Sequence, residues 1–422
     1  MRTKWILGTL FGIGLAIFGA QAASADDSQN VEYVKGQAAI DPIVKTYADI
    51  GIFAKQEGIS YDSAYAKYGP MLDFSNHEQE LLDVFGTDLL REVGVGPSEI
   101  RFIVSKPISR DERSFLEGLS IDSQVLVSPE TLSTKTISGI NQDLFWKITE
   151  RFHVPLAMWP DEAGNSLHID LGASFVPQSG VSSESGSQTA TLDAEGFTSI
   201  VDWVQSALPP GVDASVLVES GLGFTPESVT TYINGGDSLG TNSCSASFTV
   251  TGNNFVGVAT TKHCIGASSS YEGQVISAGP VTPASNGDMA VLRLSGTTAT
   301  PTFITSATSS VDITKAQDFS LAGQLGCIYG AVDSGVCDTV ATLHTCGSNL
   351  LGLSGCGMTI MNHQYSQPGD SGAGWISGSV ARGVHWGEMN NGAMYKSVLS
   401  DISALVAFGI HVVTTADIIG IG

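Results

Sequence analysis

The spacing of apolar residues changes along the chain and divides it into two parts. Between residues 38 and 160 these residues recur mainly three or four positions apart, which predicts a largely helical segment. Two such groups are Ile43, Ala48, Ile52 and Phe53, and Leu81, Leu82, Phe85, Leu89 and Leu90. From Ile233 onward, short alternating runs are separated by Gly, Asn and Ser, which predicts β-strands joined by turns.

Several elements of the first part can be placed individually. Residues 59–68 predict a short capped helix, and residues 166–176 alternate as a strand does. Residues 179–188 are rich in Ser and Gly and predict a flexible link. A helix over residues 197–208 would end before the Pro-Pro pair that follows, because proline cannot continue a helix. We therefore expect an α+β region ahead of the β-rich part.

The second part opens with a predicted hairpin over residues 247–261, SFTVTGNNFVGVATT, whose strands are joined by Gly-Asn-Asn. This hairpin returns the chain so that Cys244 and Cys264 can lie close together. Repeated short strands of this kind favour a β-barrel or a β-sandwich. Residues 401–413 predict a terminal helix.

The first residues have the pattern of a secretory signal peptide. Arg2 and Lys4 precede an apolar stretch over residues 5–20, and small residues follow it up to Ala25. We expect cleavage after Ala25, export of the chain and no stable membrane association afterwards. The alternative is an uncleaved membrane anchor, which the shortness of the apolar stretch disfavours.

Length and charge narrow the class of protein. A chain of 422 residues predicts two or three domains. Residues 26–232 carry 31 acidic and 12 basic side chains, a net charge of −19, whereas residues 233–422 carry 11 and 5, a net charge of −6. This negative charge argues against nucleic acid as a partner.

All the cysteines lie in the second part, and they are Cys244, Cys264, Cys327, Cys337, Cys346 and Cys356. An even number in an exported chain indicates disulfides, and six cysteines allow fifteen pairings. None of them form a CxxC pair, which disfavours a zinc site. We expect neither a metal nor a cofactor.

Three polar residues of the second part occur where catalysis would need them. His263 follows the second strand of the hairpin and is next to Cys264, so a disulfide would hold the imidazole as a general base must be held. Asp288 begins the apolar strand predicted over residues 285–294, from where a carboxylate can orient a histidine. Ser371 lies in a glycine-rich turn, GDSG. Each has an ordinary explanation alone, but together they match a nucleophile, its base and an orienting acid.

A serine nucleophile also needs donors for the oxyanion. Gly369 allows the backbone to turn so that its N–H and that of Ser371 can point at one oxygen. Asp312 and Asp318 are weaker candidates for the acid, because neither begins an apolar strand.

The motifs TTKHC, NGDMAVL and PGDSGAGW resemble the three active-site motifs of chymotrypsin-like serine proteases. The secreted bacterial branch, with alpha-lytic protease and the streptogrisins, is the most similar, and residues 233–250 resemble its mature N-terminus. The resemblance covers about residues 233–400. It implies an all-β, trypsin-like catalytic domain made of two six-stranded antiparallel β-barrels, with the active site in the cleft between them.

The resemblance also implies how the cysteines pair, because residues 327–337, CIYGAVDSGVC, resemble the second disulfide loop of that branch. The implied pairs are Cys244–Cys264, Cys327–Cys337 and Cys346–Cys356. Two features depart from the family pattern. Ala373 stands where many members have glycine, and no cysteine closely precedes Gly369, so another contact must hold the loop of Ser371.

Residues 383–387, GVHWG, resemble the specificity strand of bacterial glutamyl endopeptidases. In those enzymes a histidine at this place and a hydroxyl residue five before the nucleophile contact the substrate carboxylate, and these positions are His385 and Ser366. An imidazole N–H and a hydroxyl can bind a buried carboxylate by hydrogen bonds. The alternative is a structural His385 beside an apolar pocket. The implied substrate-binding residues are Tyr365, Ser366, His385, Trp386 and Gly387.

Residues 26–232 are acidic and free of cysteine, and they resemble the pro-regions of the same branch. Those segments assist folding and then inhibit the enzyme until they are removed. A β-rich domain with many nonlocal contacts folds slowly, which gives such a template a physical purpose. The implied mature start is Ile233, which follows Tyr232. A glutamate-specific enzyme would not be expected to make this cut itself. A permanent binding domain is the alternative.

We therefore expect a secreted, monomeric serine endopeptidase made as a preproenzyme. Its domains would be the signal peptide (1–25), the pro-region (26–232) and the protease domain (233–422). Its partners would be protein or peptide substrates and its own pro-region as an intramolecular inhibitor. The rival from another class is a catalytically inactive, protease-like secreted binding protein. An α/β-hydrolase is disfavoured, because it needs its serine before its acid and histidine.

Overall fold

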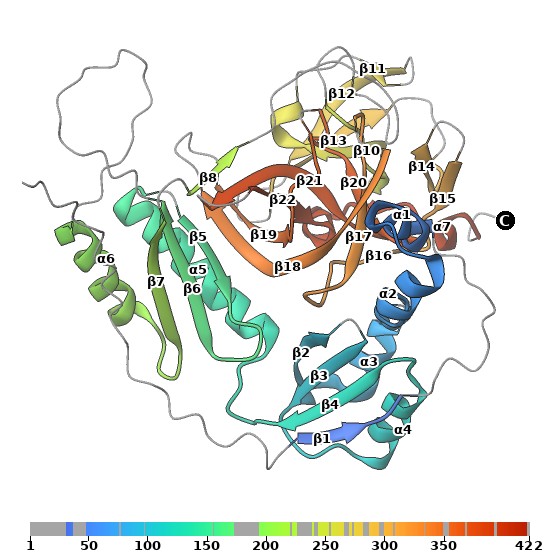
Figure 1. The fold of residues 1–422 in the computed structure, drawn as a ribbon. Helices are drawn as coiled ribbons and strands as arrows, with labels where there is room; N and C mark the ends of the chain where they lie inside the picture. Colours follow the sequence, from blue (N-terminus) through green and yellow to red (C-terminus); the bar gives the residue numbers. More distant parts are fainter. Residues whose placement is uncertain are drawn as a thin grey trace, which may run out of the picture.

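The computed structural model describes the chain from Val31 to Ile419 with gaps (Figure 1). The described residues are 31–36, 48–75, 77–96, 98–154, 156–172, 194–219, 222–225, 239, 244–252, 255–265, 270–271, 274–281, 287–294, 299–306, 309–332, 334–348, 354–367, 369–391 and 395–419. The expected signal peptide, the link over residues 179–188 and the start at Ile233 lie outside them. Within the described ranges, no helix has the length and apolar character needed to cross a membrane.

The first sheet of the N-terminal region (described residues 31–225) is small and is covered by helices. Its strands are β1 (Val31–Val34), β2 (Leu89–Gly96), β3 (Glu99–Val104) and β4 (Asp122–Val127), in the order β1-β4-β3-β2. Its helices are α2 (Tyr61–Ser75), α3 (Glu78–Phe85) and α4 (Arg110–Gly118), and helix α1 (Ala48–Glu57) precedes them. Phe74, Leu81 and Phe102 share the core between sheet and helices.

The helical interpretation of the apolar residues between Leu81 and Leu90 is wrong for the last two of them. Leu81, Leu82 and Phe85 belong to α3, but Leu89 and Leu90 begin β2. Gly86 caps the helix with a positive φ of 56°, and a short 3₁₀ turn follows it. A glycine that takes such a conformation ends a helix, whatever the spacing of the apolar residues beyond it.

A second group of elements in the N-terminal region forms a layer of strands and helices. Strands β5 (Leu156–Pro160), β6 (Ser166–Gly172) and β7 (Asp213–Glu219) pack against helices α5 (Thr134–Phe152) and α6 (Ala194–Ala207). The strand expected from residue 166 and the helix expected from residue 197 are both present. Strand β5 pairs with β18 (Ser334–Ser348), with Met158 opposite Cys346, so these strands continue a sheet of the C-terminal region.

The C-terminal region (described residues 239–419) is rich in β-strands, as expected. One sheet has the order β11-β12-β13-β10-β9-β23. Its strands are β9 (Thr249–Gly252), β10 (Phe255–Thr261), β11 (Ser270–Tyr271), β12 (Gln274–Val281), β13 (Met289–Leu294) and β23 (His411–Val412). Strands β9 and β10 are the expected hairpin.

The second sheet of the C-terminal region runs β17-β20-β21-β22-β19-β18 and then enters the N-terminal strands. Its strands are β17 (Leu325–Tyr329), β19 (Ser354–Met361), β20 (Gly374–Ser377), β21 (Val380–Asn391) and β22 (Tyr395–Asp401). The short strands β8 (Leu222–Thr225) and β16 (Lys315–Ala316) pair with β21, and β14 (Thr302–Ser306) pairs with β15 (Ser309–Asp312). Closure of two six-stranded barrels stays a prediction.

The terminal helix expected over residues 401–413 is not formed as such. A 3₁₀ helix covers Ile402–Phe408, Gly409 ends it with a φ of 66°, and β23 then pairs with β9. Only Thr415–Ile419, labelled α7, is α-helical.

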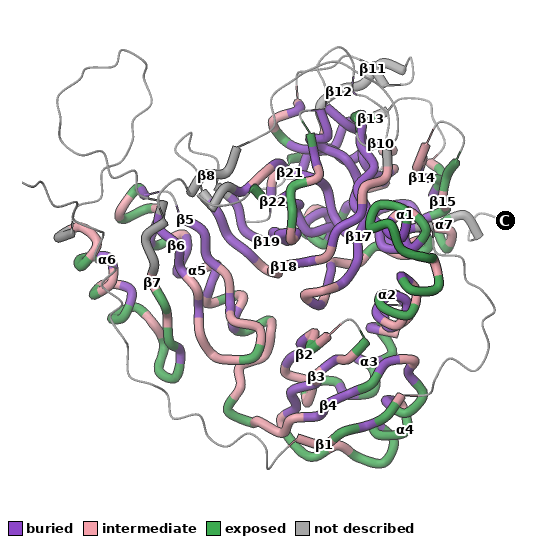
Figure 2. Tube along the Cα trace, in the orientation of Figure 1, coloured by how far each residue is buried: buried purple, intermediate pink, exposed green. Residues whose placement is uncertain are grey.

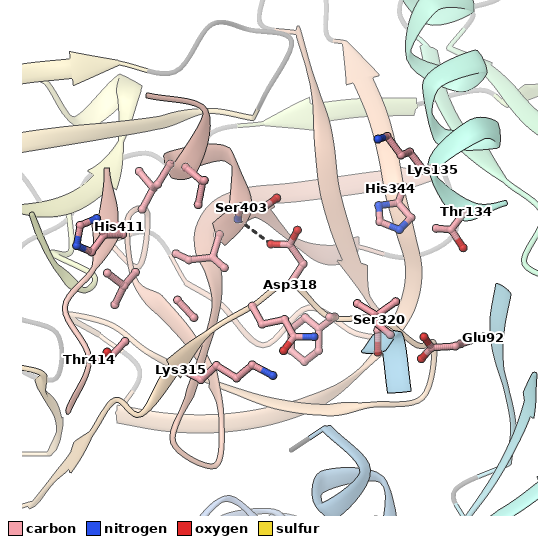
Figure 3. A pocket seen from close by; sticks show the side chains of 18 of the residues that line it. Glu92, Thr134, Lys135, Lys315, Asp318, Ser320, His344, Ser403, His411 and Thr414 are labelled. Atoms are coloured by element: carbon pink, nitrogen blue, oxygen red, sulfur yellow. Dashed lines mark hydrogen bonds between the residues drawn. The ribbon is translucent and has the colours of Figure 1, made fainter. Parts of the chain in front are cut away.

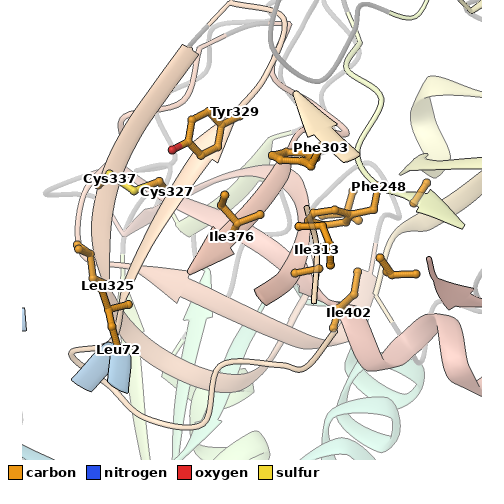
Figure 4. Packing of buried hydrophobic residues seen from close by; sticks show 14 of the residues in the cluster. Leu72, Phe248, Phe303, Ile313, Leu325, Cys327, Tyr329, Cys337, Ile376 and Ile402 are labelled. Atoms are coloured by element: carbon orange, nitrogen blue, oxygen red, sulfur yellow. A yellow bond between two sulfur atoms is a disulfide. The ribbon is translucent and has the colours of Figure 1, made fainter. Parts of the chain in front are cut away.

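The core of the C-terminal region includes side chains from the N-terminal region. Ile50, Phe53 and Leu72 of α1 and α2 join a buried cluster with Leu325 and Tyr329 (Figure 4). Figure 2 shows these helices buried on the side that faces the strands and exposed on the other. The structure contains the disulfides Cys244–Cys264, Cys327–Cys337 and Cys346–Cys356.

Candidate active site

The register of two strands brings His263 and Asp288 together. In the antiparallel pair β10–β13, Thr261 lies opposite Met289, so the residues just beyond β10 face those just before β13. His263 lies in a 3₁₀ turn that follows β10, and Asp288 immediately precedes β13. Nδ1 of His263 lies 2.9 Å from Oδ2 of Asp288.

Both side chains of this pair are mostly shielded from solvent, with exposed fractions of 19% for His263 and 14% for Asp288. The backbone N–H of Asp288 donates to the hydroxyl of Ser400 on β22, which anchors the backbone of Asp288 to a second sheet. A carboxylate at Nδ1 favours the imidazole tautomer with its proton on Nδ1 and leaves Nε2 free to accept a proton. Nε2 lies 3.4 Å from the hydroxyl of Thr261.

Ser371 is buried in a turn between Asp370 and Gly372. Ser245 holds that turn by hydrogen bonds. The N–H of Ser245 donates to the carbonyl of Ser371 over 2.7 Å, and its hydroxyl donates to the carbonyl of Gly369 over 2.9 Å. Ser245 follows Cys244, whose disulfide partner Cys264 is next to the histidine. The structure thus ties the serine turn to the histidine turn through the hydrogen bonds of Ser245 and the disulfide beside it.

The hydroxyl of Ser371 is buried and makes no hydrogen bond to any described residue. The structure therefore joins His263 to Asp288 but does not join His263 to Ser371. A buried hydroxyl without a partner is uncommon, since such a group loses its bonds to water. Unsatisfied groups of this kind occur at sites where a reacting molecule supplies the missing partner.

Asp370 is a residue that the sequence reasoning missed. It is fully buried, its Oδ1 accepts from the N–H of Val332 over 3.0 Å, and its Oδ2 accepts from the N–H of Gln367 over 2.9 Å. Asp370 and Ser245 therefore hold the loop for which the sequence supplies no neighbouring cysteine. Only the position next to Ser371 could have drawn attention to Asp370.

The backbone around Ser371 is suited to bind an oxyanion. Gly369 and Gly372 have φ values of 113° and 90°, which are left-handed conformations that favour glycine. The N–H of Gly372 is used by the carbonyl of His385. No hydrogen bond to a described residue engages the N–H groups of Gly369 and Ser371.

The expected substrate-binding residues fall into separate contacts. Ser366 is buried with its hydroxyl 3.0 Å from that of Ser397, to which the N–H of Tyr365 also donates. His385 is fully buried, and its Nδ1 lies 3.4 Å from the indole nitrogen of Trp375.

Trp386 packs in a buried cluster with Met358 and Ala157, and Gly387 lies opposite Val398 in the β21–β22 pair.

A cavity of about 790 Å³ lies away from these residues (Figure 3). It is lined by both regions of the chain, among them Glu92 and Lys135 from the N-terminal region and Asp318 and His344 from the C-terminal region. It contains none of the three residues expected to act in catalysis. We call it the inter-region cavity.

No family model and no curated protein matches the chain. Among solved structures, the chain is similar to a glutamic acid specific serine protease that uses a novel histidine triad in substrate binding. The two chains are 27% identical with a TM-score of 0.36, and the match covers 43% of this chain and 97% of that chain. Protease A of Thermobifida fusca has 26% identity, 46% and 98% coverage and a TM-score of 0.35. The chymotrypsin of Cellulomonas bogoriensis has 23% identity, 43% and 99% coverage and a TM-score of 0.36. TM-scores of this size do not carry a functional assignment, which must rest on the geometry of the site.

Proposed function

We propose that the chain is a secreted serine endopeptidase made with an inhibitory pro-region. The observation that carries this proposal is the His263–Asp288 hydrogen bond of 2.9 Å, together with a buried serine, Ser371, whose hydroxyl has no partner among the described residues. These are the base, the orienting acid and the nucleophile of acyl transfer. The three disulfides support an oxidising, extracellular compartment.

The proposed reaction uses each group in turn. Oγ of Ser371 attacks the peptide carbonyl carbon while Nε2 of His263 takes the hydroxyl proton. The N–H groups of Gly369 and Ser371 hold the oxyanion. His263 then gives its proton to the leaving amine, so the C–N bond breaks and an acyl-enzyme forms. A water molecule then attacks the acyl carbon while Nε2 of His263 takes its proton; the ester C–O bond breaks, Oγ of Ser371 regains the proton and the acid is released. Asp288 orients His263 and stabilises its cationic form throughout.

Pairing of N-terminal strands with the C-terminal sheet supports the proposed inhibitor role. Strand β8 pairs with β21 from Thr225 opposite Glu388 to Leu222 opposite Asn391, directly after Gly387. An extended substrate that adds to the edge of β21 would compete with this strand. Removal of residues 26–232 would free the edge. Strand β5 adds to β18 in the same way.

A preference for glutamate before the scissile bond is the finer part of the proposal. Its support is a buried histidine, His385, which accepts from the indole N–H of Trp375 and lies on β21 just before the residues that pair with β8. An indole N–H only donates, so Nδ1 of His385 accepts and the ring of a neutral His385 carries its proton on Nε2. An Nε2–H is a donor that a carboxylate could use.

A cleavage profile of the processed protein on a peptide mixture tests both parts of the proposal. Cuts after Glu that weaken in His385→Ala, but not in His411→Ala at an exposed histidine, support the carboxylate pocket. Cuts after large apolar residues would support the endopeptidase but contradict the preference for glutamate. No cutting by the processed protein, with Ser371→Ala behaving identically, would favour the inactive binding protein.

A further inference from the structure

Helix α1 places a carboxyl group inside the contact between the two regions. Asp49 is fully buried, its Oδ2 accepts from the backbone N–H of Gly378, and its Oδ1 accepts from the hydroxyl of Tyr329 over 3.5 Å. Two turns further along, the side-chain amide of Gln56 bonds both the N–H and the carbonyl of Cys337, at 3.1 and 3.0 Å. The N-terminal region is therefore docked by polar groups as well as by the shared apolar core.

A second carboxyl group lies at the other end of this contact. Glu92 on β2 lines the inter-region cavity, and its Oε2 atom is buried without a hydrogen-bond partner among the described residues (Figure 3). The negative charge of Glu78 of α3 acts on Glu92, and Glu78 itself lies 3.8 Å from the buried Arg382 of β21. The other charged or titratable groups that line the cavity are Arg91, Lys135, Lys315, Asp318, His344, His411 and Asp417.

Burial changes the proton affinity of both carboxyl groups. It raises the pKa of Asp49 to about 7, against the smaller opposing effect of the hydrogen bonds from Gly378 and Tyr329. Burial, with a smaller contribution from Glu78, raises the pKa of Glu92 to about 8. Tyr329 is the titratable group that faces Asp49, and burial raises its pKa, so it stays neutral.

We propose that Asp49 and Glu92, which we call the docking acids, make the contact between the two regions sensitive to pH. The N-terminal region is held firmly in acid and is released more readily above neutral pH. The regulatory meaning rests on the proposed function, because release would free the edge of β21. The docking itself does not depend on catalysis.

The direction of the pH effect on docking follows from which state, docked or open, binds more protons. In the open chain both acids face water and titrate at their ordinary pKa values near 4, whereas the docked chain keeps their protons to higher pH. Docking is therefore strongest below about pH 4 and weakens as the pH rises through the docked values. Between pH 6.5 and 8.5 the combined effect is on the order of a hundredfold in the docking equilibrium.

Other groups that line the cavity act outside this pH window or in the same direction. Burial lowers the pKa of His344, which weakens docking only below the ordinary histidine pKa of about 6.5. Burial lowers the pKa of Lys315, which weakens docking while the lysine is charged in the open chain, and this penalty fades as the pH rises towards the ordinary lysine pKa. Burial raises the pKa of Asp318, which has the same sign as the docking acids. Because Asp318 acts in the same direction, variants of Asp49 and Glu92 are needed to assign the effect to the docking acids.

Hydrogen exchange of the full-length chain tests the proposal without catalysis. The Ser371→Ala chain stays uncut, and exchange of α1 amides, corrected for the intrinsic effect of pH, reports opening of the docked region. We expect this corrected exchange to rise roughly a hundredfold from pH 6.5 to 8.5. Strand β13, which does not touch the N-terminal region through the docking acids, serves as the internal reference and should stay constant.

Variants assign the pH effect to the two acids. Asp49→Asn and Glu92→Gln, combined in the Ser371→Ala chain, should flatten the pH dependence, whereas Glu57→Gln on the exposed side of α1 should leave it unchanged. If the double variant does not fold, each single variant should remove part of the slope. A flat profile in the parent chain, or an undiminished slope in Asp49→Asn and Glu92→Gln, would overturn the proposal. Neither result would bear on whether Ser371 is a nucleophile.

Discussion

Asp288 accepts a hydrogen bond from Nδ1 of His263 over 2.9 Å, and the pairing of β10 with β13 sets this geometry. The two residues lie just beyond paired strand ends, so neither can shift without a change of register. A shift of one residue would turn every side chain of β13 to the opposite face, which its buried apolar residues resist. The pair is thus positioned by the packing of the sheet.

Replacement of Asp288 by Asn should reduce kcat/KM for peptide hydrolysis by roughly 10³- to 10⁴-fold. An amide can donate to Nδ1, which would stabilise the wrong imidazole tautomer and leave Nε2 without its acceptor role. The geometry should otherwise persist, so circular dichroism should be unchanged. Asp312→Asn, at an exposed acid of β15, is the matched control and should retain full activity.

Replacement of Gly372 by Ala should prevent the active turn from forming. A Cβ at this position would overlap the carbonyl of Ser245 and the hydroxyl of Thr260, and the φ of 90° adds strain. Gly357→Ala has a comparable φ of 67° but open space around its Cβ, so it should cost only the conformational strain of about 1–2 kcal/mol. Equal stability of the two variants in denaturant unfolding would contradict the close packing of the serine turn.

The local signals of the candidate active site are readable in the sequence because His263 follows a strand and Asp288 precedes one. Residues 247–261 show the alternation and turn of a hairpin, which places His263 at its end. Asp288 precedes an apolar run that forms β13. Once these strands pair, the contact follows from the register.

Contacts between distant segments could not be predicted in the same way. The side chains of Ser245 and Asp370 hold the turn of Ser371 by hydrogen bonds to backbone groups of other residues. Every residue has such backbone groups, so the sequence does not show which of them are bonded. The pairing of Met158 with Cys346 joins strands that are remote along the chain. The helical interpretation near Leu89 failed because apolar spacing does not register the glycine that ends α3.

Loss of the Cys244–Cys264 disulfide should affect activity more than loss of Cys346–Cys356. Both changes release a closed loop, of separation 20 and 10 residues, and each should lower the free energy of unfolding by about 3 kcal/mol. Only the first ties the histidine turn to Ser245. Activity assays of the two double Cys→Ser variants, at a temperature where both stay folded, should separate the effects. Equal activity losses would argue against this role of Ser245.

The pair of Asp161 and His168 should stabilise the N-terminal region in a defined pH range. Oδ2 of Asp161 lies 3.6 Å from Nε2 of His168; this contact raises the pKa of His168 and lowers the pKa of Asp161 to about 2. The histidine contribution is complete below about pH 6.5 and is lost above it, whereas the aspartate contribution is lost as the pH falls towards 2.

Unfolding of the Ser371→Ala chain across pH should therefore show a contribution from this pair that is largest between about pH 4 and 6.5. His168→Gln should remove that contribution, and His77→Gln, at an exposed histidine of the same region, should not. A His168→Gln variant with the parent's full pH profile would show that the pair contributes nothing to stability.

The most direct measurement of the central claim is covalent labelling of the processed protein by a fluorophosphonate, with the adduct located by mass spectrometry. The account predicts one adduct, on Ser371, that is lost in Ser371→Ala and greatly slowed in His263→Ala. No adduct on the folded, processed protein, or labelling of Ser371 at the same rate without His263, would contradict the proposed nucleophile and base.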